Sequence, residues 1–320
     1  MPKLKVIYDT DPGVDDAMAL LLIARHPDIE LLGVTTCFGN ATIETTTHNA
    51  LFLKQQFGFS APVAKGAGKP LVGEADAPPT FVHGMNGMGD IALPEVTEAL
   101  DPRPAHQLII DLLRAQPGQI TIIAVGRMTN LALALEADPE IVGLVKEIVV
   151  MGGAFGRNGH TGNVTPVAEA NIWGDPTAAD IVFGTAWPVV IAGLDVTEET
   201  IMTEAYLAQF AAEAGADGKF VRDISAFYQD FHRDSAGLDG IYTHDSSAVF
   251  YALHPEWYRT ERGTIRVVTD GIAIGQTIIK PEGKSFSPGP WDDRPVQTIC
   301  VGVDAPAVLE LYRNTLVGNG

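Results

Sequence analysis

The 320-residue chain is 46% hydrophobic and 19% charged, a composition typical of a globular protein that buries a sizeable core and not of a disordered chain. Forty acids against 21 lysines and arginines give a formal net charge of -19, which repels nucleic acid backbones and anionic lipid surfaces. We therefore expect neither a nucleic acid nor a membrane as a partner.

The chain is expected to form one domain over residues 1–320, because no linker, charge block or low-complexity run divides it. Its two cysteines, Cys37 and Cys300, lie in apolar segments and are too few for a disulfide framework. The first residues lack the long apolar stretch of a signal peptide, and no later run is long enough to span a membrane. These features favour a cytoplasmic location.

Short apolar runs rich in valine and isoleucine alternate with segments at helical spacing. This alternation predicts an α/β fold with a mostly parallel central sheet flanked by helices. Three later runs lie closer together and predict a small additional antiparallel β element, and residues 215–243 predict a helical insertion. The five earlier runs are residues 4–9, 29–37, 120–125, 147–153 and 188–195, and the three later ones are residues 264–270, 275–280 and 296–303.

Ligand sites in such sheets lie beyond the carboxyl ends of the strands. The residues that follow the apolar runs here are mostly polar or glycine, namely Asp9, Asp11, Asn40, Gly126, Arg127, Gly152, Gly153 and Asp195. Residues 66–90 and 215–243 are rich in residues typical of loops or mobile segments. We expect either segment to be able to close over a ligand.

Four carboxylates fall within the eight residues from Asp9 to Asp16, between an apolar run and the predicted helix 17–24. Crowded carboxylates raise one another's pKa unless a cation is present, and oxygen ligands suit hard cations. A preference of acids for helix N-termini would explain Asp15 and Asp16 but leaves Asp9 and Asp11 unexplained. The segment therefore predicts a metal site.

Asp245 precedes the apolar helix expected over residues 246–253 and is either a further metal ligand or the N-cap of that helix. The dipeptide His244-Asp245 by itself favours the N-cap. The neighbouring His244 and the loop residue His83 are each compatible with a functional or an ordinary histidine. Glu169 and Asn171 would share one face if their segment is extended.

Seven motifs occur in an order that resembles the inosine-uridine-preferring nucleoside hydrolases over about residues 4–255. They are DTDPGVDDA from Asp9, Asn40, His83 in a glycine-rich loop, MTNLA from Met128, VVMGGAF from Val149, TGN from Thr161 with AEAN from Ala168, and HD at His244. Two positions depart from the family pattern. Arg127 stands where the family often has proline, and Ser246 follows the HD pair where the family has proline.

The resemblance implies hydrolysis of the N-glycosidic bond of ribonucleosides to ribose and free base. It further implies a calcium ion held by Asp11, Asp16, Asp245 and a backbone carbonyl near Val125. Calcium-bound water would be the nucleophile and Asp11 the general base. Asp15 would hold the ribose 2'-hydroxyl, and Asp9 would support the metal ligands from behind.

The same resemblance assigns residues to the sugar. Asn40 and Asn171 would line the ribose, and Asn163 and Glu169 would face its 5'-hydroxyl. The partner is therefore expected to be a small-molecule nucleoside, and the family implies a homodimer or a homotetramer.

Four further side chains are expected to contact the nucleobase. His244 would face the base as proton donor, and His83 would help to bind or position it. If residues 224–231 are helical, Tyr228 and His232 lie one turn apart and border the base as well. A tyrosine that simply faces the core is the alternative interpretation of Tyr228. We expect inosine to be accepted and uridine to be a further candidate.

Two other functions stay open at this point. A haloacid-dehalogenase-like phosphatase also has the pattern Asp9-Thr10-Asp11 after an apolar strand, although the continuation Pro12-Gly13-Val14-Asp15 and the density of acids argue against it. A nucleoside-binding protein without turnover would keep the same pocket.

Overall fold

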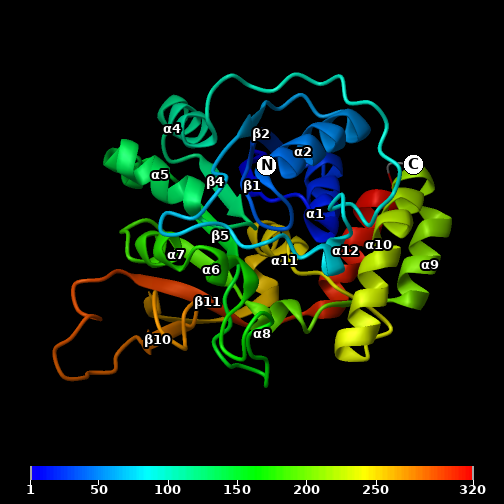
Figure 1. Cartoon of the computed structure of the whole chain (residues 1–320). Helices are drawn as coiled ribbons and strands as arrows, with labels where there is room; N and C mark the ends of the chain where they lie inside the picture. The colour runs from blue at the N-terminus through cyan, green and yellow to red at the C-terminus, as the bar shows by residue number, and fades with distance from the viewer. Residues whose placement is uncertain (1, 319–320) are drawn as a thin grey trace.

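The computed structural model of the chain describes residues 2–318, in which a nine-stranded sheet forms the centre (Figure 1). A separate pair, β7 (Ile201–Thr203) and β8 (Gly240–Tyr242), is antiparallel. In spatial order the strands of the main sheet are β10 (Thr277–Pro281), β9 (Tyr258–Val267), β11 (Val296–Val303), β6 (Val189–Ala192), β5 (Glu147–Met151), β4 (Ile120–Ala124), β1 (Leu4–Thr10), β2 (Ile29–Thr36) and β3 (Val63–Lys65).

Six strands from β6 to β3 pair in parallel, as the apolar runs predict. β11 continues the parallel part by pairing with β6, whereas β9 runs antiparallel to both β11 and β10. The predicted fold class is therefore confirmed. The three late strands extend one edge of the main sheet and do not form a sheet of their own, and the separate β pair comes from two short strands that the sequence patterns did not indicate.

Helices cover both faces of the sheet. The principal ones are α1 (Val14–Arg25), α2 (Ile43–Phe57), α4 (Ala105–Ala115), α5 (Thr129–Ala137), α7 (Pro176–Phe183), α9 (Glu204–Glu213), α10 (Gly215–Ala236), α11 (Ser246–Leu253) and α12 (Ala305–Val317). Three one-turn helices connect them: α3 (Thr80–His83), α6 (Ala170–Gly174) and α8 (Leu194–Thr197). Two 3-10 turns cover Pro139–Gly143 and Pro255–Trp257.

The strands bury side chains on both faces. On β1, Val6 and Tyr8 enter a core shared with α1, α2 and α9 to α12, while Ile7 enters a second core shared with α4, α5 and α7. Figure 1 shows these two groups of helices on opposite sides of the sheet. Because neighbouring side chains on a strand point to opposite faces, a sheet covered twice requires continuous apolar strands, and the sequence provides them.

The carboxyl ends of β1, β2, β4 and β5 lie along one edge of the parallel part, so the residues after these strands converge there. Most of residues 66–104 has no regular structure apart from α3, as the glycine- and proline-rich composition of its first part predicts. Between residues 2 and 318, no helix combines the length and the apolar character that crossing a membrane requires.

Candidate active site

A cavity of about 630 Å³ opens at the carboxyl ends of the parallel strands, within the size range of small-ligand sites. Its wall combines residues that follow the strands with residues from α3, α6 and α10. Among the lining residues that the sequence singled out are Asp15, Asn40, His83, Val125, Asn163, Glu169, Asn171, Tyr228, His232, His244 and Asp245. Segments more than 200 residues apart in the chain thus form one pocket.

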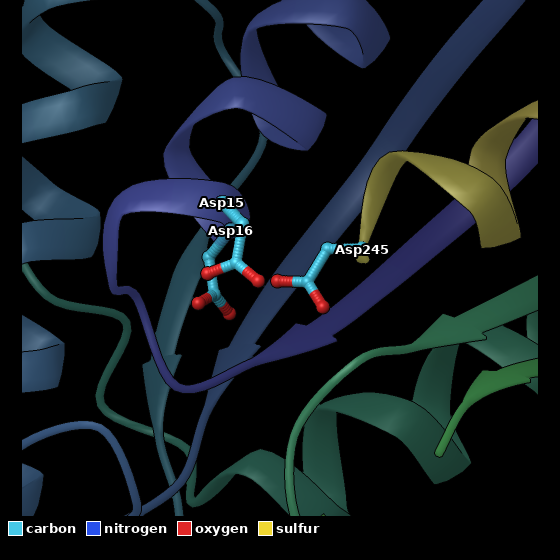
Figure 2. A group of neighbouring side chains, drawn as sticks. All are labelled: Asp15, Asp16 and Asp245. Carbon is cyan, nitrogen blue, oxygen red and sulfur yellow. The ribbon is translucent and has the colours of Figure 1, made fainter. Parts of the chain in front are cut away.

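Three carboxylates meet at the base of this cavity. Asp15 and Asp16 come from the first turn of α1, and Asp245 comes from the residue before α11. One oxygen of each lies within 4.8 Å of the others, and all three residues are buried. Figure 2 shows the Asp245 carboxylate directed at the other two. Asp16 and Asp245 meet as expected, but the third member of this cluster is Asp15, which the resemblance assigned to the ribose, and not Asp11.

Asp16 is held by hydrogen bonds from four groups. Its oxygens accept from the Thr10 hydroxyl, from the backbone amides of Asp11 and Gly13, and from the Asn40 side chain at 2.9 Å. The bond from Gly13 also completes the N-terminal capping of α1, so the helix-terminus interpretation of this acid holds in part. A Cβ on Gly13 would lie 2.8 Å from both Asn40 Nδ2 and His83 Nδ1, which explains why this position needs glycine.

Asp245 does not act as an N-cap. Its backbone already has helical angles, φ -70° and ψ -36°, and its side chain accepts no hydrogen bond from the first turn of α11 within residues 2–318. The N-cap interpretation that the dipeptide favours is therefore wrong. The side chain points from the start of α11 to the acidic cluster instead (Figure 2).

Asp11 has a partner that the sequence did not assign to it. Arg127 donates from Nη1 to Asp11 Oδ2 at 2.5 Å, and the Asn40 amide donates to the same oxygen at 2.8 Å. The other oxygen, Oδ1, is buried and has no hydrogen-bond partner among the described residues. The position of Arg127 directly after β4 indicated a place at the site, but no sequence pattern indicated the ion pair.

Asp9 is buried and does not line the cavity. Its Oδ1 accepts hydrogen bonds from the Thr35 hydroxyl and from the Asn130 side chain, which tie β1 to β2 and to α5. Burial raises the pKa of Asp9 to about 6 despite these bonds.

The residues that the resemblance assigned to the ribose adopt a different local structure from the extended one that the sequence suggested. Glu169 is the N-cap of α6 and accepts from the amides of Asn171 and Ile172, and Gly153 donates to it as well. Asn171 donates to the carbonyl of Val125 at 2.7 Å, and Asn163 is exposed and accepts from the Ala170 amide. Glu169 and Asn171 therefore share the cavity through a helix cap, not through strand alternation.

Three histidines line the cavity opposite these residues. His83 is the last residue of α3, and its Nδ1 accepts from the Val14 amide at 3.3 Å. His244 Nδ1 lies 2.8 Å from the Thr197 hydroxyl. Burial lowers the pKa of His83 and of His244 to about 3 and the pKa of His232 to about 4, so all three rings are neutral at neutral pH.

Tyr228 and His232 lie in the 22-residue helix α10, which confirms the predicted helix. Both are buried, yet both line the cavity, so Tyr228 is not merely a core residue. The Tyr228 ring stacks on His83 with centroids 5.3 Å apart, and its hydroxyl lies 3.4 Å from Asp15 Oδ2. The aromatic wall and the acidic cluster are therefore in direct contact.

The chain matches the family model "Inosine-uridine preferring nucleoside hydrolase" over residues 6–310. The chain belongs to this family. It is 39% identical to the probable uridine nucleosidase 1 of Oryza sativa, over 98% of this chain and 96% of that protein. It is 40% identical to the inosine-uridine preferring nucleoside hydrolase of Leishmania major, over 87% and 88% of the two chains. The solved structure of a plant nucleoside hydrolase superposes with a TM-score of 0.95 at 36% identity, covering 99% of each chain.

The chain is thus a nucleoside hydrolase, an enzyme that acts on ribonucleosides. The match over nearly the whole length leaves no basis for the phosphatase alternative. The pattern Asp9-Thr10-Asp11 after β1 misled in that direction because many α/β enzymes place acids at the end of a strand.

The acidic cluster fits the metal dependence of the family. Its donors are all oxygen atoms, which suits a hard cation, and the buried oxygens Asp11 Oδ1 and Asp15 Oδ1 lack hydrogen-bond partners within the described chain. Burial, together with the charge of Asp16, raises the pKa of Asp15 to about 8, and burial with neighbouring acids raises the pKa of Asp245. A bound cation would lower the pKa values of both carboxyls again.

These shifts predict how the stability of the metal-free nucleoside hydrolase depends on pH. A carboxyl whose pKa is near 4 in the unfolded chain and about 8 in the folded chain keeps its proton better when folded. The free energy of unfolding is therefore greatest near pH 4, the pKa of the unfolded chain, and it falls as the pH rises toward 8. With a chelator present, the Tm should fall between about pH 5 and about pH 8.5, and saturating calcium should flatten this dependence.

Thermal melts of Asp15→Asn provide the control, because an amide does not titrate. This variant should show a shallower fall of Tm in chelator. A Tm that rises with pH in the metal-free wild-type protein would contradict the assignment of protonated carboxyls to the cluster.

Proposed function

We propose that this nucleoside hydrolase releases free base from purine and pyrimidine ribonucleosides in a calcium-dependent reaction with Asp11 as the general base. The observation that carries the proposal is the position of the acidic cluster. Its buried oxygens lie beside a cavity whose wall also contains neutral histidines and a tyrosine, and the Tyr228 hydroxyl lies 3.4 Å from Asp15 Oδ2. An ion-binding end and an aromatic end fit the two halves of a nucleoside.

Asp11, Asp16 and Asp245, with the Val125 carbonyl, are the proposed ligands. The calcium ion, when bound, orients the attacking water and the ribose hydroxyls at this point of the cavity. Calcium accepts six to eight oxygens, so both oxygens of Asp16 suit it even though each already accepts hydrogen bonds. The Val125 carbonyl has a second lone pair besides the one that accepts from Asn171.

Asp11 takes the proton of the attacking water in this proposal. Its position is fixed by the Asn40 amide and by Arg127, both on Oδ2, so Oδ1 is the oxygen without a hydrogen-bond partner in the described chain. Asp15 holds the 2'-hydroxyl, and Asn40 and Asn171 line the sugar. The carboxylates around the ribose stabilise the positive charge that develops on the ring as the C1'–N bond breaks.

His244 donates a hydrogen bond to the departing base. Because the Thr197 hydroxyl occupies the neighbourhood of Nδ1, the ring presents Nε2 to the cavity, and a neutral imidazole with the hydrogen on Nε2 is a suitable donor. Thr197 then donates to Nδ1. His83, Tyr228 and His232 complete the wall that contacts the base, and Tyr228 provides a ring face for purines and pyrimidines alike.

The charge of the cavity favours free nucleosides over nucleotides. Five acids line it, Asp15, Asp76, Glu169, Glu198 and Asp245, against one basic side chain, Arg127, among the described lining residues. Arg127 is already paired with Asp11. Since the names of relatives include both uridine nucleosidases and an inosine-uridine preferring enzyme, we propose inosine and uridine as substrates.

Three properties remain expectations from the sequence: a cytoplasmic location, a homodimeric or homotetrameric assembly, and the ability of either residues 66–90 or residues 215–243 to close over a ligand. A pocket that binds nucleosides without turnover is the remaining alternative to catalysis. Incubation of the purified protein with inosine and a reducing-sugar assay would separate the two, because binding alone releases no ribose.

Removal of the metal ion or of the general base Asp11 should abolish turnover. Prolonged chelation is expected to stop inosine hydrolysis, and added calcium should restore it. Asp11→Asn should lower kcat by at least about a hundredfold with a smaller effect on KM, because general-base catalysis contributes roughly that much. Asp28→Asn, an exposed acid, is the charge-matched control and should leave kcat unchanged. Full activity of a metal-free sample would refute the calcium requirement.

Free nucleosides should be preferred to their 5'-monophosphates. We expect kcat/KM for inosine to exceed that for its 5'-monophosphate by at least about a hundredfold, because a phosphate near Glu169 would face a carboxylate. Glu169→Gln should narrow this ratio, while Glu136→Gln, at an exposed site, should not. Equal kcat/KM values for the two compounds in the wild-type enzyme would contradict the placement of the 5'-hydroxyl at Glu169.

The role of His244 predicts a difference between leaving groups. His244→Ala should lower kcat for inosine by at least about a hundredfold but should retain cleavage of p-nitrophenyl riboside, whose aglycone departs without a proton. Thr197→Val should weaken inosine turnover in the same direction through the loss of orientation. Comparable losses for both substrates in His244→Ala would mean that the residue does not act through a hydrogen bond to the leaving base. If inosine kinetics are unchanged in both Tyr228→Ala and His244→Ala, the proposed base site is wrong.

A further inference from the structure

Arg127 is a buried cation inside the acidic end of the cavity. The residue is 8% exposed, and its guanidinium lies 5.7 Å from the centre of the Phe38 ring while Nη1 donates to Asp11. Its Nε is buried without a hydrogen-bond partner in the described part of the chain. An arginine seldom occupies such a place, because desolvation of its charge must be offset by a specific partner.

Two glycines make room for this side chain. A Cβ on Gly39 would lie 1.8 Å from Arg127 Nη1, and a Cβ on Gly174 would lie 2.4 Å from Nε. The backbone of Gly174 does not have the positive φ that favours glycine, so space for Arg127 is the reason for a glycine at that position. The guanidinium therefore has a site that three separate segments of the chain shape around it.

The contact to Asp11 gives the guanidinium a direct influence on the proposed metal site. Asp11, Asp15, Asp16 and Asp245 are buried together, and Arg127 is the cation that pairs with one of them. A guanidinium keeps its charge at all relevant pH values. A metal ion that binds the same carboxylates is repelled by this fixed positive charge. The ion would also share Asp11 with the guanidinium.

We propose that Arg127 is an internal counter-cation of Asp11 that stabilises the metal-free site and weakens its affinity for calcium. The proposal rests on the calcium site of the proposed function and adds a residue that sets its strength. Arg127 keeps Oδ2 of Asp11 engaged, and Oδ1 is the oxygen without a hydrogen-bond partner among the described residues. The site then releases and rebinds its metal ion more readily than it would without Arg127.

The test compares two substitutions at the same position. Arg127→Met removes the charge and keeps a side chain of similar length, whereas Arg127→Lys keeps the charge. Arg313→Met controls for net charge. Arg313 pairs with Glu213 and does not line the cavity. Calcium dissociation constants are measured by titration calorimetry on metal-stripped protein at fixed pH and ionic strength.

We expect Arg127→Met to bind calcium at least about tenfold more tightly than the wild-type protein, and the Lys and Arg313→Met variants to stay within about threefold of it. Without metal, Arg127→Met should have a lower Tm than the wild-type protein, and calcium should raise its Tm by a larger amount. Equal or weaker calcium binding by Arg127→Met would overturn the proposal, because it would mean that Arg127 positions Asp11 and does not compete with the ion.

If Arg127→Met does not fold without calcium, it is purified with the ion and the calcium dissociation rate is measured with a fluorescent chelator. A slower release than from the wild-type protein supports the proposal, and an equal or faster release overturns it. Absence of calcium binding in every variant would refute the metal site of the proposed function as well. Tight binding with equal affinities would refute only the role of Arg127.

Discussion

Burial of several carboxylates at the end of β1 is the constraint around which this structure is organised. Five acids are buried there: Asp9, Asp11, Asp15, Asp16 and Asp245. A buried charge loses its hydration, which costs free energy unless a cation or hydrogen-bond donors take the place of the water. The surrounding chain supplies donors from four segments, which include the amides before α1, Asn40 after β2 and Asn130 in α5. The remaining unpartnered oxygens define the place for a cation.

The donors of this cluster also connect the strand ends to one another. Asn40 contacts Asp16 through its side chain and Asp11 through its amide, so the segment after β2 is attached to both sides of the α1 turn. Tyr228 links the cluster to the aromatic wall through Asp15, and α10 is thereby joined to the N-terminal turn. The acidic cluster and the aromatic wall of the cavity are thus held by one continuous set of contacts, which fixes the relative positions of the side chains that line it.

Much of the fold and part of the site follow from local sequence. Continuous apolar runs specify strands buried on both faces, and Gly13 with Asp16 specifies the sharp entry into α1. The ordered motifs identify the family because each one lies at a strand end or a helix start, where the fold places its ligand site. Local patterns failed at Asp245 and Glu169, since a dipeptide or an alternation of two residues does not reveal where the following helix begins.

The sequence by itself determined the α/β class, the family and the residue types that a hydrolase of nucleosides needs, because these depend on periodicity and on motifs within a few residues. Only the tertiary structure decided which side chains meet: that Asp245 faces Asp15, that Tyr228 lines the cavity, and that Arg127 binds Asp11. The physical reason is that an ion pair between residues 116 positions apart depends on the packing of whole strands and on the space left by Gly39 and Gly174.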